Sequence, residues 1–459
     1  MSSLGTDQNP MRAAIVGSGP SGFYATEALL KAEPVILVDM FERLPSPFGL
    51  VRSGVAPDHP KLKQPILVYQ RIAESPEFRF LGNVTVGRDV SVQELAACYH
   101  AVVFTCGAET DRKLGIPGEE LPGSHTATEF VGWYNGHPDY CDRVFDLSHE
   151  NAVVIGQGNV AVDVCRILSK TVDELRHTDI AKRALEVLAE SKVRDIYMIG
   201  RRGPAQAKFT HTELRELGKL EDCDPVVDPR DLELNPASQE ELADRRNRAN
   251  IKSCEVLQEF ASRAAPTRWR RCHIQFLKSP TELRGERRLE RVVLVRNRLE
   301  GEPSRQVARE TGETEELACG VLFRSIGYRG VPIAGVPFDD DRGIFPNREG
   351  RIVDGQNVVP GLYAAGWIKR GPTGIIGTNR EDGVATVNSL LADLPHLGAA
   401  AKPGADGLQG LLKDRGVRVV SYADWQKIDA AEVRRGAAQG KPREKFTRVA
   451  EMLAALDQN

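Results

Sequence analysis

The sequence has no long hydrophobic run and almost no net charge. No stretch approaches the roughly 18–20 uninterrupted apolar residues that a membrane-spanning helix needs, so we expect no membrane insertion. The 61 Lys and Arg residues nearly balance the 64 Asp and Glu residues, which leaves a formal charge of −3. This balance argues against a nucleic-acid-binding protein, which would carry a basic field. The first residues contain neither an apolar signal core nor an Arg-rich transit segment, and we therefore expect a cytoplasmic protein.

Clustered cysteines are also missing. Iron–sulfur clusters, structural zinc sites and redox-active disulfides use closely spaced cysteines, and no two cysteines here are closer than eight residues apart. We therefore expect no metal site and no redox disulfide. We interpret the cysteines as free, mostly buried thiols in a reducing compartment. They are Cys98, Cys106, Cys141, Cys165, Cys223, Cys254, Cys272 and Cys319.

What the chain does contain is enough apolar sequence for large cores. Its 459 residues, 41% of them hydrophobic, fit two or three domains. Short apolar strands alternate with longer amphipathic helices, a pattern that predicts an α/β fold with parallel sheets. Near the C-terminus the pattern predicts a surface loop over 399–410 and amphipathic helices over 425–429 and 444–456, to which we assign no chemistry.

A glycine-rich turn follows the first apolar strand, residues 13–16. Gly17, Gly19 and Gly22 have G-x-G-x-x-G spacing, a helix is expected over about 23–31, and a second strand over 35–38. In such a turn the first glycine allows the tight bend, the second lets a pyrophosphate approach the backbone, and the third packs helix against strand. An acid at the end of the second strand binds the ribose, and here Asp39 and Glu42 compete for that role.

A second turn of this kind follows the strand at 151–155. It contains Gly156, Gly158 and Ala161, the alanine being an allowed replacement of the third glycine. The next strand, 196–199, ends at Arg201 and Arg202 instead of an acid. Two guanidinium groups there suit a 2′-phosphate, so we expect NADP(H) rather than NAD(H). The spacing between turn and arginines is long, which requires an insertion over 170–192.

Two dinucleotide turns in one chain imply two nucleotide cofactors. The first is most simply FAD, and the second is a nicotinamide nucleotide that supplies hydride to it. Residues 102–108 and 361–366 look like further strands of the flavin half, and a helix from near Gly377 would aim its N-terminus at the flavin ring.

The order of these segments predicts the domain organisation. We expect an α/β fold with two Rossmann-like dinucleotide-binding domains, the NADP-binding domain being inserted into a discontinuous FAD-binding domain. The predicted boundaries are 1–110 for the first part of the FAD domain, 111–330 for the NADP domain, and 331–459 for the second part of the FAD domain with C-terminal helices.

Several longer motifs resemble those of a known family. The chain is similar to adrenodoxin-reductase-type ferredoxin–NADP reductases over nearly its whole length, and most similar to the actinobacterial members. The motifs that carry the resemblance are PFGLVRSGVAPDHP at 47–60, GRRGP at 200–204, ELREL at 213–217 and GWIKRGPTG at 366–374. The resemblance implies bound FAD, NADPH as hydride donor, and an iron–sulfur ferredoxin as electron acceptor, with haem monooxygenases as one class of downstream enzyme.

The resemblance also implies site residues. The expected flavin contacts, besides Gly19 and Gly22 of the turn, are Gly17, Ser21, Glu42, Leu50, Val84, Trp367, Gly374, Ile375 and Ile376. The expected NADP contacts are Arg112, Gln157, Gly158, Asn159, Val160, Arg201, Arg202, Glu213 and Gly374. Near the point where nicotinamide and flavin meet we expect His59 and either Glu213 or Glu216, which share a helix face because they are three residues apart.

Ferredoxins are typically acidic, and one part of the chain is basic. Residues 243–298 contain 15 Lys or Arg residues and 6 Asp or Glu residues. We predict that this segment docks the ferredoxin on a monomeric reductase, because a basic patch steers an acidic partner. Its densest part is Arg245, Arg246, Arg248, Arg268, Arg270 and Arg271.

Four other functions are compatible with two dinucleotide turns. A pyridine-nucleotide disulfide reductase would need a redox cysteine pair, and the flavin subunit of a glutamate-synthase-like assembly would need a cysteine-rich arm. A flavin monooxygenase is possible from the fold alone, and would oxygenate an organic substrate. A non-catalytic NADPH sensor would keep both turns and reduce no acceptor.

Overall fold

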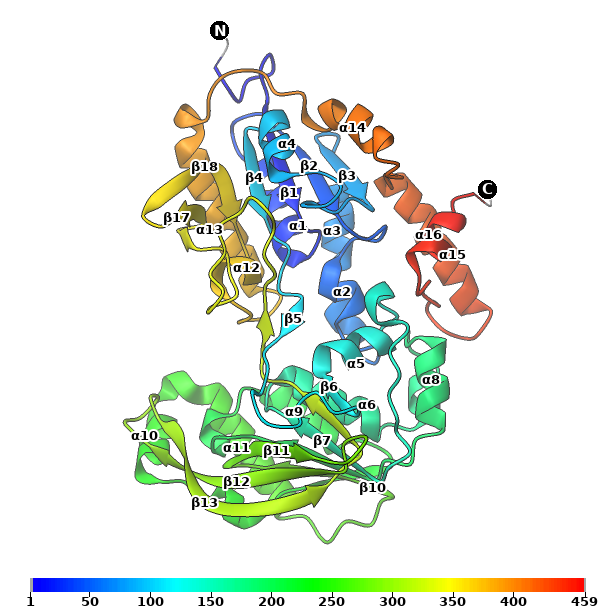
Figure 1. Cartoon of the computed structure of the whole chain (residues 1–459), viewed down its shortest axis with the longest axis vertical. Coiled ribbons are helices and arrows are strands. Elements are labelled where there is room, and N and C mark those ends of the chain that lie inside the picture. The colour runs from blue at the N-terminus through cyan, green and yellow to red at the C-terminus, as the bar shows by residue number, and fades with distance from the viewer. Residues whose placement is uncertain (1–2, 458–459) are drawn as a thin grey trace.

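The computed structural model describes residues 3–457, and two lobes stand one above the other in Figure 1. The upper lobe is built on a seven-stranded sheet. Five of its strands are parallel, and two antiparallel strands extend one edge. In spatial order the strands are β16 (Asn347–Arg348), β17 (Arg351–Asp354), β18 (Asn357–Ala364), β4 (Ala101–Phe104), β1 (Met11–Val16), β2 (Ile36–Glu42) and β3 (Phe78–Gly82).

The lower lobe is built on a six-stranded parallel sheet. Its strands are, in spatial order, β6 (Ser124–Thr126), β14 (Val321–Arg324), β7 (Asn151–Ile155), β8 (Asp195–Ile199), β10 (Arg270–Gln275) and β9 (Cys223–Val226). An antiparallel meander is attached to it, comprising β11 (Lys278–Arg284), β12 (Arg291–Glu300) and β13 (Val307–Ala318).

The chain crosses between the lobes in two short strands, β5 (Thr110–Asp111) and β15 (Tyr328–Arg329), which pair with each other. One dinucleotide-binding fold is therefore inserted into the other, and the predicted fold class is confirmed. The exact boundaries at 110 and 330 stay a prediction, which the position of this strand pair supports.

Both faces of each sheet are covered, so alternate residues of the central strands are buried on opposite sides. Helices cover both faces of the upper sheet, whereas the lower sheet has helices on one face and the β11–β13 meander on the other. Ala13 and Ile15 of β1 face one core, and Ala14 and Val16 face another. The helices of the upper lobe are α1 (Pro20–Leu30), α2 (Gly49–Ser53), α3 (Ile66–Ala73), α4 (Val92–Cys98), α12 (Trp367–Arg370), α13 (Thr378–Asp393), α14 (Gln409–Asp414), α15 (Tyr422–Ala437) and α16 (Val449–Ala454).

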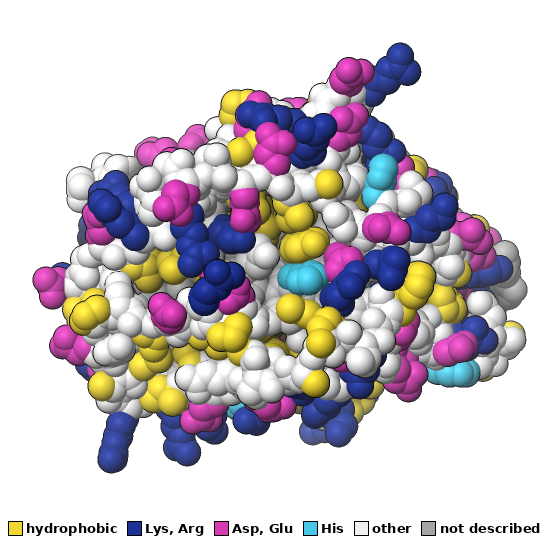
Figure 2. All heavy atoms as spheres, turned by 90° about the horizontal axis from the view of Figure 1, so that it is seen from below, with side chains coloured by type: hydrophobic (Ala, Val, Ile, Leu, Met, Phe, Trp, Pro, Cys, Tyr) yellow, Lys and Arg dark blue, Asp and Glu magenta, His cyan; other side chains and the backbone are white. Residues whose placement is uncertain are grey.

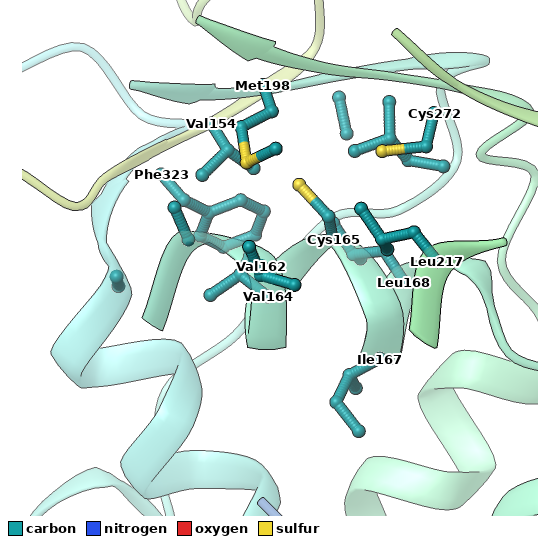
Figure 3. Close-up of a cluster of buried hydrophobic side chains, with 14 of the residues drawn as sticks. Val154, Val162, Val164, Cys165, Ile167, Leu168, Met198, Leu217, Cys272 and Phe323 are labelled. Atoms are coloured by element: carbon teal, nitrogen blue, oxygen red, sulfur yellow. The ribbon is translucent and has the colours of Figure 1, made fainter. Parts of the chain in front are cut away.

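The lower lobe has helices of its own between its strands. Figure 3 shows Val154, Met198 and Phe323 of three neighbouring strands packed over Val162 and Cys165 of α6. Its helices are α5 (Ala127–Tyr134), α6 (Asn159–Ser169), α7 (Val172–Leu175), α8 (Lys182–Ala189), α9 (His211–Leu217), α10 (Pro236–Ala243) and α11 (Arg248–Ala261). The short helices α7 and α8 form the insertion expected over 170–192. No helix within residues 3–457 has the length and apolar character needed to cross a bilayer.

All eight cysteines are free, and six of them are buried, as the sequence predicts. The hydrogen bond with Cys165 and burial raise the pKa of Cys272, so its thiolate is strongly disfavoured.

Three predictions about elements need correction. Helix α1 begins at Pro20, not after Gly22, because proline is favoured in a first helical turn. Residues 399–410 are not only loop, since a 3-10 turn at Gly404–Leu408 leads into α14. The last helix begins at Val449 instead of 444, because the preceding residues run along the lower lobe and their charged side chains are bonded there.

Candidate functional site

The first glycine-rich turn lies at the carboxyl edge of the upper sheet. Gly17 has φ +106°, and a Cβ there would lie 2.7 Å from the Thr105 carbonyl oxygen. A Cβ at Gly22 would lie 2.2 Å from the Gly17 carbonyl oxygen, whereas a Cβ at Gly19 would meet nothing within 4 Å. The turn is thus tight and packed except at Gly19, where the backbone is open to a ligand. The N-terminus of α1 behind it has no side-chain cap, so its N–H groups are free for an anion such as a pyrophosphate.

The two acids of β2 have different surroundings. Glu42 is at the strand end, beside the turn, where its carboxylate accepts hydrogen bonds from the Ser18 backbone, the Ser18 hydroxyl and the Leu44 backbone. Asp39 is buried within the strand and binds Arg79, Tyr99 and the backbone of Ala405. Glu42 is therefore placed for a ribose, and Asp39 holds the loop before α14 in position.

The other predicted flavin contacts gather around this turn. Ser21 packs against Gly366 and bonds Asn379, and the backbone of Val84 donates to the Glu42 carbonyl oxygen. The α2 helix begins at Gly49, where a Cβ would lie 2.9 Å from Gly19. Two apolar side chains here face solvent, Leu50 at 43% and Ile375 at 67% exposure, and a bound flavin would cover such surface. Trp367, Gly374 and Ile376 lie on the same segment of chain as Ile375. The predicted flavin contacts around the first turn therefore fit FAD as a group.

Trp367 shows contacts that sequence reasoning missed. Tyr328 of the crossover strand β15 stacks on its ring, with centroids 5.3 Å apart. Asp382 of α13 accepts a hydrogen bond from the Gly366 backbone and forms ion pairs with Lys369 and Arg370. These contacts hold the Gly366–Gly371 turn beside the first glycine-rich turn.

The second glycine-rich turn repeats the first at the edge of the lower sheet. Gly156 has φ +134°, and its Cβ would lie 2.1 Å from the Ser325 carbonyl oxygen, whereas Gly158 again faces open space. Gln157 bonds the Gln275 carbonyl oxygen, and Asn159 accepts from the backbone of Thr210, which caps α9. Val160 is half-buried in the first turn of α6, whose N-terminus has no side-chain cap. This turn is therefore open to a second dinucleotide.

Arg201 and Arg202 follow β8 next to this turn. The backbone of each is held, by Asn297 and Leu277 respectively, while Arg201 is exposed and Arg202 half-buried. Burial and the neighbouring Arg201 lower the pKa of Arg202. Within residues 3–457 neither guanidinium forms a salt bridge, so both fit an anionic 2′-phosphate. Arg112 directly follows β5 and is exposed, and its backbone N–H donates to the Gly327 carbonyl oxygen between β14 and β15.

His59 lies between two glutamates of α9, where the lobes meet. Its Nε2 is 2.6 Å from Glu216 Oε2, and its Nδ1 is 3.7 Å from Glu213 Oε2. The structure therefore brings together all three residues that we expect near the nicotinamide. The sequence left open which glutamate lies near the nicotinamide; in the structure both are beside His59, and the hydrogen bond goes to Glu216.

The three groups have shifted pKa values. Burial opposes charge on His59, but the hydrogen bond with Glu216 and the carboxylates of Asp58 and Glu213 outweigh it, so its pKa is raised. The His59 hydrogen bond lowers the pKa of Glu216. Burial and the nearby Asp163 raise the pKa of Glu213. The site thus combines an imidazole whose protonated form is favoured by Glu216 with a second carboxyl group, Glu213, that takes up a proton more readily.

The three side chains are close enough for a metal ion, with ligand atoms within 4.8 Å of one another. The arrangement nevertheless favours an ion-pair cluster. Each imidazole nitrogen faces a different carboxylate. Arg166 Nη1 lies 3.6 Å from Glu213 Oε2, and Arg166 Nε lies 3.7 Å from Glu216 Oε2. Arg166 supplies the positive charge that a cation would otherwise supply.

Arg166, Asp163 and Asp58 are residues of this site that the sequence interpretation did not include. Arg166 bonds Asp58 of the upper lobe and Asp163 of its own helix. The available signal was a pair of charges three residues apart on α6, whose other inward positions are apolar.

The six densest arginines of 243–298 do not form one surface, contrary to the prediction. Arg245, Arg246 and Arg248 are exposed at the start of α11, near Ala205 and the second turn. The other three lie beyond the far end of this helix, about 21 Å away along its axis. There they form ion pairs: Arg268 with Asp224, Arg270 with Asp222, and Arg271 with Asp195. Figure 2 shows acidic and basic side chains interspersed over the lower face.

The surface that Arg245, Arg246 and Arg248 form instead extends to α9. Lys252 follows Arg248 by one helical turn, and Lys252 and Arg215, together with burial, lower the pKa of His211. We call the surface of Arg215, Arg245, Arg246, Arg248 and Lys252 the α9–α11 surface. It is next to the helix that carries Glu213 and Glu216.

Known proteins are similar to this chain in sequence and in structure. No protein-family model matches the chain. The chain is 48% identical to the NADPH-ferredoxin reductase FprA of Mycobacterium tuberculosis, over 97% of this chain and 98% of that protein. It is 46% identical to the mitochondrial NADPH:adrenodoxin oxidoreductase of Homo sapiens, over 98% of this chain and 93% of that protein.

A solved structure matches as well. That of Mycobacterium tuberculosis FprA in complex with NADPH has a TM-score of 0.92 and 46% identity, covering 98% of this chain and all of that one. Identity at this level over nearly full length confirms the resemblance found in the sequence motifs. The chain belongs to the family of NADPH-ferredoxin reductases and NADPH:adrenodoxin oxidoreductases.

Proposed function

We propose that this protein is an FAD-containing reductase that transfers electrons from NADPH to an iron–sulfur ferredoxin. The observation that carries the proposal is the pair of glycine-rich turns with the His59 cluster between the lobes. The strand after the first turn ends at Glu42, and Arg201 and Arg202 follow the strand after the second turn. When bound, FAD accepts two electrons as hydride from NADPH and releases them singly to a one-electron acceptor.

The residues of the upper lobe hold the flavin in this proposal. The backbone of Gly17–Gly22 and the N-terminus of α1 bind the pyrophosphate, and Glu42 binds the ribose. Leu50, Val84, Trp367, Gly374, Ile375 and Ile376 surround the remainder. Apolar surface at Leu50 and Ile375 supports this role, because the ring excludes water from the place where hydride moves.

The residues of the lower lobe hold NADPH. Gln157, Gly158, Asn159 and Val160 surround the pyrophosphate, and Arg112, Arg201 and Arg202 bind the phosphates and the adenosine end. Glu213, with Glu216 and His59, orients the carboxamide of the nicotinamide. Hydride transfer depends first on geometry, so this role needs a fixed cluster more than it needs a proton donor.

We propose that an acidic ferredoxin docks on the α9–α11 surface. Arg215 of this surface is on the same helix as Glu213 and Glu216. In the part of the chain that the structure describes, Arg246 is the only one of its cations that is paired, with Asp244, whereas Arg268, Arg270 and Arg271 are all paired. A basic surface beside the site accelerates the encounter with an acidic partner, and salt weakens this effect. A cytoplasmic location, a monomeric state and supply of electrons to haem monooxygenases stay predictions.

Anaerobic stopped-flow absorbance tests the reaction. The yellow protein is mixed with NADPH or NADH, and then with an oxidised ferredoxin. We expect NADPH to bleach the flavin much faster than NADH does, and the ferredoxin to restore the colour as it is reduced. A protein that takes up no FAD would refute the proposal. Bleaching with no transfer to any ferredoxin would leave the NADPH–flavin half and refute the partner.

Charge reversal tests the docking surface. Arg245→Glu, Arg246→Glu and Arg248→Glu together should raise the KM for ferredoxin at least about tenfold at low salt and leave flavin reduction by NADPH unchanged. Arg305→Glu is the control, because Arg305 is exposed on the turn between β12 and β13 of the same lobe. An equal KM for the triple variant and the control would locate docking elsewhere.

A further inference from the structure

A buried arginine lies beneath the His59 cluster. The Arg166 side chain is 1% exposed although it belongs to an otherwise apolar stripe of α6. Its Nε and Nη2 bond the two oxygens of Asp58 at 2.8 and 3.1 Å, and Nη2 also bonds Asp163 at 2.7 Å. Three hydrogen bonds to two carboxylates therefore fix the orientation of this planar guanidinium.

These bonds join the two lobes. Asp58 precedes the 3-10 turn at Pro60–Lys63 of the upper lobe, while Arg166 and Asp163 belong to α6 of the lower lobe. Asp58 is 4% exposed, and it also contacts Lys170 at 2.9 Å. Although burial alone would raise it, Arg166 and Lys170 hold the pKa of Asp58 well below its usual range. The carboxylate is therefore charged at every working pH, and the bonds between lobes persist.

The arrangement of Arg166 and His59 is equally defined. Because Asp58 directly precedes His59, fixing the aspartate restricts where the imidazole can lie. Arg166 Nη2 is 3.4 Å from His59 Nδ1, and Glu216 is 2.6 Å from Nε2 on the other side of the ring. A guanidinium donates hydrogen bonds and accepts none, so a neutral His59 presents its Nδ1 lone pair to Arg166 and its Nε2 proton to Glu216.

Charges of both signs act on His59. Asp58, from its own segment, and Glu213 and Glu216, from α9, favour protonation, and so does Asp163 from α6, whereas Arg166 opposes it. With four carboxyl groups around one imidazole, Arg166 is the balancing cation closest to the ring.

We propose that Arg166 is the positioning residue of the hydride-transfer site: by fastening Asp58 to α6, it fixes His59 between the two glutamates of α9. The assignment of this site to hydride transfer rests on the proposed function. The fastening itself belongs to the protein without substrate, and it is tested separately.

Two substitutions separate the charge of Arg166 from its shape. Arg166→Met removes both, while Lys170 remains to pair with Asp58. Arg166→Lys keeps a cation but not the planar fork that reaches Asp58 and Asp163 together. The matched control is Lys170→Met, because Lys170 binds the same carboxylate and the structure gives no contact between Lys170 and the imidazole.

The first readout is the titration of the His59 imidazole by NMR, with His59→Gln used to assign its signal among the nine histidines. In Arg166→Met the midpoint should move upward by about one pH unit, because a nearby positive charge is lost. Arg166→Lys and Lys170→Met should stay close to the parent protein. This measurement needs no NADPH, so it holds even where the proposed function fails. An unchanged midpoint in Arg166→Met overturns the proposal.

The second readout is flavin reduction by NADPH in stopped flow, which tests the shape of the clamp. Arg166→Lys should lower the limiting rate at least about tenfold, with NADPH half-saturation changed less than about threefold, because positioning affects the reacting groups more than the distant phosphates. Full rate in Arg166→Lys overturns the positioning role. An equal loss of the limiting rate in Lys170→Met would also overturn it, because the rate would then depend only on Asp58 being held, whichever cation holds it. Should Arg166→Met not fold, Arg166→Lys and this control still decide.

Discussion

The two glycine-rich turns have similar backbone geometry, but the strands that follow them lead to side chains of opposite charge. In each, the first glycine has a positive φ and packs on a neighbouring carbonyl group, and the second faces open space. The strand that follows the first turn ends at the carboxylate of Glu42, and the strand that follows the second ends at Arg201 and Arg202. The turn geometry therefore fits a pyrophosphate at both places, and in the proposed function the charge at the strand end distinguishes the two dinucleotides.

The turns also differ at their third position. Gly22 has no space for a Cβ, which would lie 2.2 Å from the Gly17 carbonyl oxygen and 3.0 Å from Thr105 Oγ1. Ala161 occupies the equivalent place in the second turn and is completely buried with its methyl group accommodated. The first helix thus lies closer to its turn than the second, and the two turns should respond oppositely to one methyl group.

Exchanging these residues gives the largest effect. Gly22→Ala should abolish FAD retention and destabilise the protein by roughly 3 kcal/mol or more, because the clash is with backbone that cannot move aside. Ala161→Gly should cost about 1 kcal/mol through helix propensity and retain FAD. Flavin absorbance relative to protein and the thermal midpoint measure both. A yellow, stable Gly22→Ala protein would show that the first turn relaxes more easily than its geometry suggests.

Removing the arginines from the second strand end should have the next largest effect. Arg201→Ala with Arg202→Ala should raise the KM for NADPH about 100-fold and leave that for NADH nearly unchanged, because only NADPH has the 2′-phosphate. Arg298→Ala is the control, since Arg298 is an exposed arginine of the same lobe on β12. Parallel losses with both nucleotides would assign the arginines to another part of the cofactor.

The sequence predicted what is local and missed what is assembled from distant segments. The turns, Glu42 and the arginine pair lie within one strand–turn–helix unit each, so their spacing indicates their geometry. The contact between Asp58 and Arg166 spans 108 residues and two lobes, and no local pattern predicts it. The arginines of 243–298 were grouped because they are close in sequence, but α11 separates them by its whole length. The last helix was predicted too early because periodicity does not reveal that Lys441 and Glu444 are bonded to the lower lobe.

The first strand end allows a more modest test. Glu42→Gln should weaken FAD binding about tenfold, because the neutral amide is a poorer acceptor for a ribose hydroxyl. Asp39→Asn is the matched substitution in the same strand, and it should lower the thermal midpoint with little effect on FAD, since Asp39 binds Arg79 and Tyr99. Flavin titration of the apoprotein and thermal unfolding separate the two. Equal loss of FAD in both variants would contradict the assignment of the ribose to Glu42.

The smallest expected effect concerns a buried lysine that connects the two lobes. Lys445 is 2% exposed between the lobes, donating to the carbonyl oxygens of Arg52 above and Asn135 below, with Asp179 3.1 Å away. Burial lowers its pKa to about 7, although Asp179 opposes the shift. Between pH 7 and about 10 the unfolded chain therefore holds a proton on this lysine that the folded protein has released, and stability from this group rises with pH.

Comparison with Lys445→Met isolates that contribution. Asp179 stays paired in this variant, because Lys63 binds it at 2.7 Å. The thermal midpoint of the parent protein minus that of Lys445→Met should increase by a few °C from pH 7 to pH 9. Lys427→Met, at an exposed lysine of α15, should show no such trend. A difference that stays constant would mean that Lys445 keeps its proton in the folded state, held by Asp179 and the two carbonyl groups. The attachment between the lobes would then be a permanent ion pair, independent of pH across this range.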